Sequence, residues 1–179
     1  MLSTATAVVW HLSGVADEFR RQPPRLAEVF QKYDTPLYFV TFNTMHRRYR
    51  LANERVHSAL RIYCETGVAT ARAAVGRYVI MPDHVHLFVS GDASFDLSIW
   101  VRGLKRAISK AIASTNIEAM AAATSSRIWQ PGFFDHLMRS SESYAQKWIY
   151  VRENPVRAKL VAHAEDWPYQ GGIVPIARA

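Results

Sequence analysis

The sequence predicts an α+β protein in which an antiparallel β-sheet carries helices on its surface. Segments rich in aromatic and β-branched residues, which are typical of strands, alternate with segments whose apolar residues recur at helical spacing. Along the chain these segments follow the order strand, helix, strand, strand, helix, strand, helix. This order indicates a single sheet with helices packed on it.

The length and composition predict one globular domain with a basic surface. The chain has 179 residues, of which 49% are hydrophobic. We expect an N-terminal extension of uncertain order at 1–33, the domain at 34–170 and a short tail at 171–179. Lysine and arginine exceed aspartate and glutamate by 22 to 15, and the net charge of +7 suits a polyanionic partner. Such a charge can also serve solubility alone.

Cysteine content and hydropathy indicate the cellular compartment in which the protein works. The single cysteine, Cys64, excludes an intramolecular disulfide framework and a multi-cysteine zinc site, and we expect it to be a buried helix residue. No stretch approaches the 18 apolar residues of a membrane span, and the N-terminal segment lacks the features of a signal peptide. We therefore expect a soluble cytoplasmic protein without a membrane partner.

The first strand is expected in TPLYFVTFNT (35–44), and the sequence HRRYRL (46–51) after it reads as a basic loop. A helix is expected over 53–67, because its apolar residues have helical spacing. Asn53 is a suitable N-cap for this helix, and Gly67 is a suitable end.

Two extended runs follow, at 74–81 and 83–90, separated by Met81-Pro82-Asp83. Proline cannot donate a hydrogen bond to a β-ladder, so this tripeptide indicates a turn. The two runs form either a hairpin or one kinked strand.

The second helix begins near Ser94 and is amphipathic. Its apolar residues form one stripe, and Arg102, Arg106 and Lys110 follow one another at four-residue steps along another. Such a basic stripe either contacts phosphates or is simply solvated.

The remaining elements are shorter. Residues 114–126 read as a connector rich in Ala, Ser and Thr. Two short extended pieces follow around Pro131-Gly132, and a last helix that starts at 141 must stop before Pro155.

Two histidines lie one residue apart in the strand expected at 83–90. Side chains alternate between the two faces of a strand, so His84 and His86 share one face. Two imidazoles on one face can hold a divalent cation if a third ligand comes from elsewhere. Paired strand histidines also occur as structural hydrogen bonders.

The last helix offers a partner for these histidines. Tyr150 and Asn154 are four residues apart, so we expect them on one face of a helix. A tyrosine with a pKa of about 10 is a poor nucleophile, but beside a metal-bound phosphate it can attack phosphorus. Without that context, Tyr150 reads as an amphipathic residue at a helix–sheet boundary.

Four segments in fixed order, MPDHVHLFVS, IWQPGFFDHLMR, YVRENPVRAKLV and EDWP, resemble the REP-associated tyrosine transposases of the HUH single-strand DNA transposase superfamily. The resemblance runs from about Thr35 to Trp167. It implies a ferredoxin-like or RRM-like antiparallel sheet flanked by helices, the HUH endonuclease fold. It also implies that His84, His86 and Asn154 bind a divalent metal and that Tyr150 is the nucleophile.

The implied activity is metal-dependent nicking and joining of single-stranded DNA at short palindromic hairpins. Tyr150 would join a 5′ phosphate and free a 3′ hydroxyl, with Mg²⁺ or Mn²⁺ as the metal. The protein would act as a monomer or a homodimer. The residues that we expect to contact DNA are Arg47, Arg48, Arg50, Arg102, Lys105, Arg106 and Lys110.

Two other functions stay open at this point. One is a non-catalytic RRM-like module that binds single-stranded nucleic acid through aromatic and basic residues. The other is a metal phosphoesterase with a water nucleophile, which predicts that Tyr150→Phe leaves cleavage intact. Trp129 and Trp148 either stack on bases or pack in the core.

Overall fold

The computed structural model describes residues 36–48, 50–70, 73–92, 94–113, 128–138 and 141–175. The predicted extension at 1–33 and the predicted connector at 114–126 lie outside these residues. No helix within the described ranges is long and apolar enough to cross a membrane.

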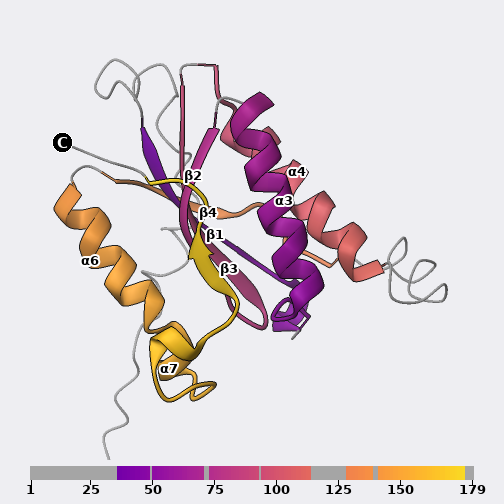
Figure 1. Ribbon diagram of the computed structural model, residues 1–179. Coiled ribbons are helices and arrows are strands. Elements are labelled where there is room, and N and C mark those ends of the chain that lie inside the picture. Colours follow the sequence, from indigo (N-terminus) through magenta and orange to yellow (C-terminus); the bar gives the residue numbers. More distant parts are fainter. Residues whose placement is uncertain are drawn as a thin grey trace, which may run out of the picture.

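Within the described residues, five strands form one antiparallel sheet in the order β4-β1-β3-β2-β5 (Figure 1). The strands are β1 (Leu37–Asn43), β2 (Ala73–Ile80), β3 (His84–Gly91), β4 (Phe134–Met138) and β5 (Gln170–Gly172). The main helices are α3 (Glu54–Thr70), α4 (Leu97–Ala113), α6 (Ser141–Arg152) and α7 (Asn154–Arg157). The succession β1-α3-β2-β3-α4-β4 is that of a ferredoxin-like unit, so the predicted fold class is confirmed.

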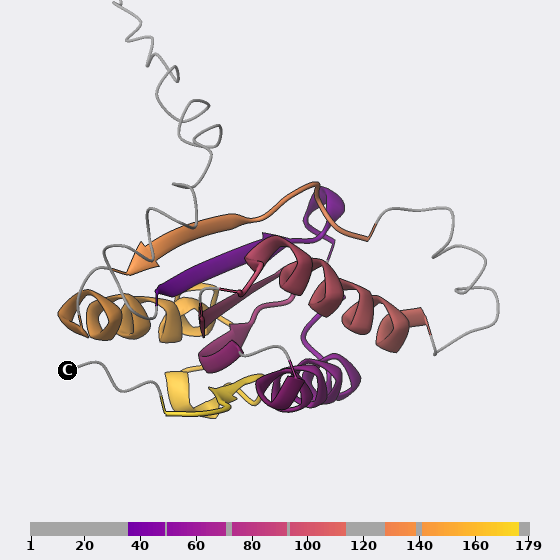
Figure 2. The same ribbon diagram turned by 90° about the horizontal axis from the view of Figure 1, so that it is seen from above.

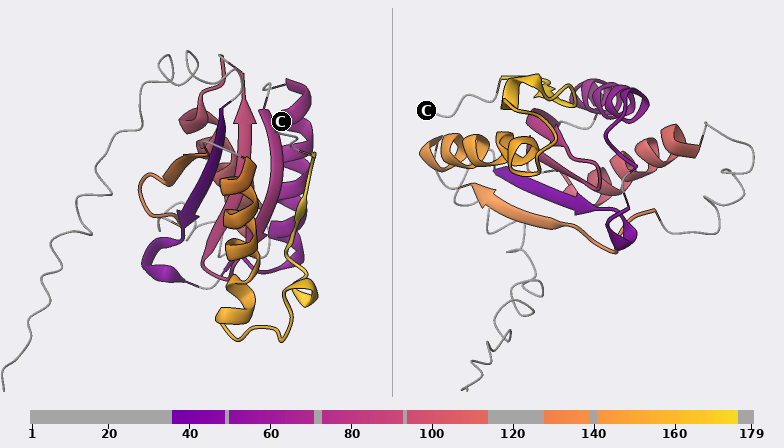
Figure 3. Two further views of the ribbon diagram at one scale, coloured as in Figure 1. Left: turned by 90° about the vertical axis from the view of Figure 1, so that its left-hand side faces the viewer. Right: turned by 90° about the horizontal axis from the view of Figure 1, so that it is seen from below.

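Helices cover both faces of the sheet. Viewed from above, the sheet separates α6 from α3 and α4 (Figure 2). The left panel of Figure 3 shows α6 in front of the strands and α3 behind them. Alternate residues of β1 serve the two cores: Val40 and Phe42 pack in the cluster under α3 and α4, and Phe39 packs in the cluster under α6.

Helix α3 starts as the sequence predicts but ends later. The backbone N–H of Val56 donates to Asn53 Oδ1 at 3.1 Å, which confirms the predicted N-cap. The prediction that Gly67 ends the helix was wrong, because α3 continues to Thr70. A Cβ at Gly67 would lie 3.5 Å from Trp100 Nε1, so this position faces α4 at a close approach of the two helices. Cys64 is buried in α3, as expected, and burial raises its pKa to about 12.

The two extended runs around Pro82 form a hairpin rather than one kinked strand. Strands β2 and β3 pair antiparallel, and the N–H of Met81 donates to the carbonyl of His84 at 2.8 Å. Of the two pieces predicted around Pro131-Gly132, the second is β4. The first makes only an isolated bridge, from Trp129 to Thr44 at the end of β1.

The last predicted helix is confirmed: α6 starts at Ser141 and ends at Arg152, before Pro155. Pro155 occupies the first turn of a further helix, α7, where its missing N–H costs nothing. The C-terminal part departs from the prediction in two other ways. The prediction that Tyr150 and Asn154 share one helix was therefore wrong, since a break at Glu153 separates them. The expected tail also contributes to the sheet, because β5 pairs with β2.

Gly91→Ala tests the packing at the end of β3. A Cβ there would collide with the base of the Phe95 side chain, which is buried in the core. We expect the substitution to lower the free energy of unfolding by about 1–3 kcal/mol, measured as a lower urea midpoint. Gly172→Ala on β5 is the control, because its Cβ would meet only ordinary contacts at 3.9 Å. Equal midpoints for the two variants would contradict this account.

Candidate functional site

The histidine pair lies near the start of β3, on the face of the sheet that α6 covers. In the register of β1 with β3, Asn43 is opposite His84 and Thr41 is opposite His86. The imidazole centroids are 4.6 Å apart and the ring planes are nearly perpendicular, at 83°. The side chain of His84 is 13% exposed, and His86 also keeps only part of its surface exposed. The expectation that the two histidines share one face is confirmed.

A buried carboxylate orients His84. Asp83 Oδ1 lies 2.6 Å from His84 Nδ1, and its Oδ2 forms a 2.6 Å ion pair with Arg47 Nε. Arg47 in turn donates to Asn43 Oδ1 at 2.6 Å. Because a carboxylate only accepts, a neutral His84 carries its proton on Nδ1 and keeps the Nε2 lone pair for a ligand. Burial lowers the pKa of His84, while the hydrogen bond and charge of Asp83 oppose this effect.

His86 is held in a comparable way by a hydroxyl and a ring. Its Nδ1 lies 2.7 Å from Thr41 Oγ1. The imidazole stacks on Phe39 with centroids 5.4 Å apart and an interplanar angle of 18°. A proton on Nδ1 donated to Thr41 would again leave Nε2 free to bind a metal.

Helix α6 brings positive charge toward His86. Lys147 Nζ lies 5.1 Å from the centroid of Phe39, the ring on which His86 stacks. Burial lowers the pKa of His86 to about 3, and neighbouring charges act in the same direction, from His84, Lys147, Arg47 and Arg157. At neutral pH this imidazole is therefore uncharged, which is the form that binds metals.

Arg157 contacts both Tyr150, the candidate nucleophile, and Asn154, the candidate third metal ligand. Tyr150 is 61% exposed on α6, and the guanidinium of Arg157 lies 4.1 Å from its ring centroid. Arg157 also donates to the backbone carbonyl of Tyr150 and to Asn154 Oδ1. Tyr150 and Asn154 thus share Arg157 as a partner, although the break at Glu153 puts them in different helices.

The third metal ligand that the sequence predicts is an amide, from Asn154. The described residues contain no group of three His, Cys, Asp or Glu side chains that could hold a metal ion. Two neutral imidazoles and an amide oxygen from Asn154 would make such a set, with open positions for substrate. The roles of these residues stay predictions.

Sequence reasoning missed three residues that shape this site: Asp83, Thr41 and Arg157. Asp83 immediately precedes His84, and Arg157 follows Asn154 by one helical step, so both lay within recognised segments. Thr41 carries no such signal, because it lies 45 residues away from His86 in the sequence.

The residues expected to contact DNA divide between two surfaces. Arg47, beside the histidines, is in an ion pair, and Arg48 and Arg50 are exposed near it. The exposed stripe at Arg102, Arg106 and Lys110 lies on α4, on the opposite face of the sheet.

Lys105 was also expected to contact DNA, and this stays a prediction; in the structure its ammonium is engaged within the protein. It is half-buried, and its ammonium donates to the carbonyl oxygens of Gln130, at 3.3 Å, and Gly132. Burial lowers the pKa of Lys105 to about 8. Trp129 packs edge-on against Phe42 but stays partly exposed, and Trp148 packs against the cluster under α6.

Substitutions around Asp83 should move the pKa of His84 in opposite directions. Asp83→Asn should lower it further, because the carboxylate raises it by a hydrogen bond and by charge. Arg47→Ala should raise it, because the guanidinium lowers it. An NMR pH titration of the imidazole resonances measures both shifts. Shifts of the same sign would contradict the arrangement described.

Two known proteins of similar sequence carry the same description. A relative from Escherichia coli (strain K12), a "REP-associated tyrosine transposase", is 24% identical over 137 residues, which cover 74% of this chain and 73% of the relative. A Haemophilus influenzae relative, provisionally described in the same way, is 33% identical over 95 residues, 50% of this chain and 53% of the relative.

A solved structure has the same fold. It shows a REP-associated tyrosine transposase bound to a REP hairpin, and it matches with a TM-score of 0.60 and 24% identity over 75% of each chain. The resemblance predicted from the sequence motifs is thereby confirmed. The family model for IS200-like transposases matches residues 34–154, which is more than half of the sequence. The chain therefore belongs to the IS200-like transposase family.

Proposed function

We propose that this chain is a metal-dependent transposase that nicks and joins single-stranded DNA through a covalent bond to Tyr150. One observation carries the proposal: two histidines with Nδ1 engaged lie on the sheet face that α6 covers, and α6 presents an exposed tyrosine. The family match supports DNA strand transfer as the reaction class.

The residues that would hold the metal are His84 and His86, through Nε2, and Asn154, through Oδ1. Asp83, which only accepts, would fix His84 in the tautomer that binds, and Thr41 would hold the ring of His86 in place through Nδ1. Nitrogen and oxygen donors with open positions suit Mg²⁺ or Mn²⁺. When bound, such an ion supplies Lewis-acid polarisation of the scissile phosphate.

Tyr150 would attack the phosphorus with its phenolic oxygen. The new bond joins this oxygen to the 5′ phosphate, and the bond from phosphorus to the 3′ oxygen breaks. The phenol loses its proton, and the departing oxygen gains one to become a 3′ hydroxyl. One phosphodiester replaces another, so a free 3′ hydroxyl can reverse the step without a high-energy cofactor.

Arg157 is placed to assist this step. Its guanidinium lies over the Tyr150 ring and donates to Asn154 Oδ1. A guanidinium binds phosphate oxygens through several N–H groups, and a cation there would stabilise the negative charge that develops during transfer. We infer that Arg157 changes partner from Asn154 to the phosphate when DNA binds.

The substrate that we propose is single-stranded DNA that forms a short hairpin. The solved relative is bound to a REP hairpin. The net charge of +7 and the exposed arginines near the histidines suit a polyanion.

Tyr150→Phe should abolish the covalent protein–DNA product and leave DNA binding intact, because only the nucleophilic oxygen is removed. The measurement is a denaturing protein gel after incubation with labelled hairpin DNA from the flanks of the gene, with Mn²⁺ or with EDTA. Tyr144→Phe is the matched control, because Tyr144 lies on the same helix with its ring packed against Phe88. Cleavage by Tyr150→Phe would favour a water-using phosphoesterase instead.

Arg157→Ala should slow formation of the covalent product by about 10²-fold, the usual effect of removing one charge-stabilising donor. Arg157→Lys should recover part of the rate, because it keeps the charge and loses the planar fork. Single-turnover kinetics at saturating DNA measure both. Rates for both variants equal to that of the unsubstituted protein would contradict a role for Arg157 in the transfer step.

A further inference from the structure

A pocket of about 610 Å³ lies on the opposite face of the sheet from the histidines. Helix α4 forms one wall, and the segment that leads into β4 forms the other. The residues on which its chemistry depends are Arg102, Lys105, Arg106, Trp129, Gln130 and Phe133. The volume lies within the usual range for small-ligand sites.

The α4 wall offers positive charge. Arg102 and Arg106 are exposed and one helical turn apart, and no acidic side chain among the described residues forms an ion pair with either. Two guanidinium groups at this spacing suit the oxygens of a phosphate. They make the pocket complementary to an anionic ligand.

The second wall offers aromatic rings that are held in place. Trp129 Nε1 donates to the carbonyl of Lys105 at 3.1 Å and to Ser109 Oγ at 2.8 Å. The Lys105 ammonium in turn binds the carbonyls of Gln130 and Gly132. These bonds fix the segment that carries Trp129 and Phe133 before any ligand arrives, which limits the entropy lost on binding.

The same segment connects the pocket to the catalytic face. The N–H of Gln130 donates to the carbonyl of Asn43 at 3.0 Å. Asn43 pairs with His84 across the sheet, and its side chain accepts a hydrogen bond from Arg47. The pocket and the histidines therefore flank the end of β1, so a single DNA strand that passes this end of the sheet and Arg47 can reach both.

We propose that the pocket binds one unpaired nucleotide of the DNA strand, with the base against Trp129 and Phe133 and a phosphate between Arg102 and Arg106. The identity of the ligand as DNA rests on the proposed function. An unpaired base exposes the ring faces that such a pocket can contact, whereas a base in a duplex does not.

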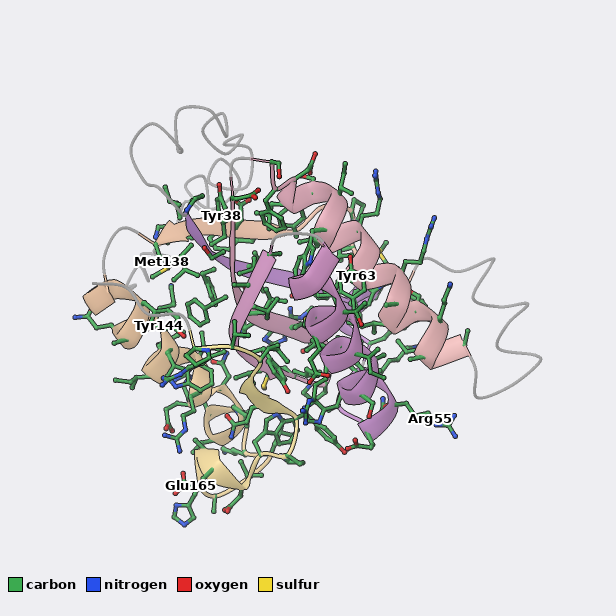
Figure 4. All side chains as sticks on the ribbon, turned by 45° about the horizontal axis from the view of Figure 1, so that its top comes forward. Tyr38, Arg55, Tyr63, Met138, Tyr144 and Glu165 are labelled. Carbon is green, nitrogen blue, oxygen red and sulfur yellow. The ribbon has the colours of Figure 1, made fainter. Side chains whose placement is uncertain are left out.

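The test measures binding without chemistry. All variants are made in the Tyr150→Phe protein and measured in EDTA, so that no cleavage occurs. The probe is a fluorescein-labelled 12-nucleotide oligothymidylate. Its fluorescence anisotropy gives the Kd at several salt concentrations. Arg102→Ala with Arg106→Ala removes two charges from the pocket. Arg55→Ala with Arg61→Ala removes two charges from the exposed surface of α3, where Arg55 projects away from the fold (Figure 4).

The pocket pair should reduce the slope of log K against log salt by about 0.7, because the two arginines share one phosphate and each phosphate contact of a single strand contributes about 0.7. The α3 pair should leave both the slope and the Kd at the parent values. Equal losses from the two pairs would overturn the proposal, because they would reflect net charge alone.

The aromatic wall is tested by Phe133→Leu, which keeps apolar packing and removes the ring. The Kd for the oligothymidylate should rise about tenfold, as expected from the loss of one stacked base, with an unchanged salt slope. Binding of a 12-base-pair duplex should not change. An unchanged Kd in a variant whose thermal melting matches the parent would overturn the proposal.

These outcomes are independent of the tyrosine chemistry. If pocket variants weaken binding while a covalent product persists in Tyr150→Phe, the nucleotide site stands and the proposed mechanism fails. If the covalent product requires Tyr150 while the pocket variants bind as the parent does, the mechanism stands and the nucleotide site fails.

Discussion

The register between β1 and β3 is the constraint on which the site depends. It places Thr41 opposite His86 and Asn43 opposite His84. Both faces of these strands are buried under helices, so a slip of one residue would exchange the two sets of side chains and put the histidines under α3 and α4. The apolar packing of the two cores therefore also specifies the geometry of the histidine pair.

Buried polar groups next to the two strands determine the protonation and the orientation of the imidazoles. Asp83 is only 7% exposed, yet it is ion-paired with Arg47 and hydrogen-bonded to His84, so its charge is compensated. Burial keeps His86 neutral and Thr41 restrains its ring. The same packing that stabilises the sheet thus prepares two nitrogen donors.

The break between α6 and α7 and the contact of α4 with the segment before β4 play parallel roles. The break lets Arg157 contact both Tyr150 and Asn154. On the other face, Lys105 ties the segment that carries Trp129 to α4. In each case a basic side chain organises a surface instead of simply adding positive charge to it. The end of β1, an interior strand of the sheet, lies between the two surfaces.

Local pattern in the sequence determined strands β1 to β4, helices α3, α4 and α6, and the placing of both histidines on one face, because side-chain alternation and helical periodicity depend on neighbouring residues alone. The cap at Asn53 is equally local. Contacts between distant segments decided the rest: α3 continues past Gly67 beside α4, and Lys105 lies 25 residues from the carbonyl of Gln130 that it binds. Local sequence cannot encode such contacts, because they exist only once the chain has closed its loops and brought the segments together.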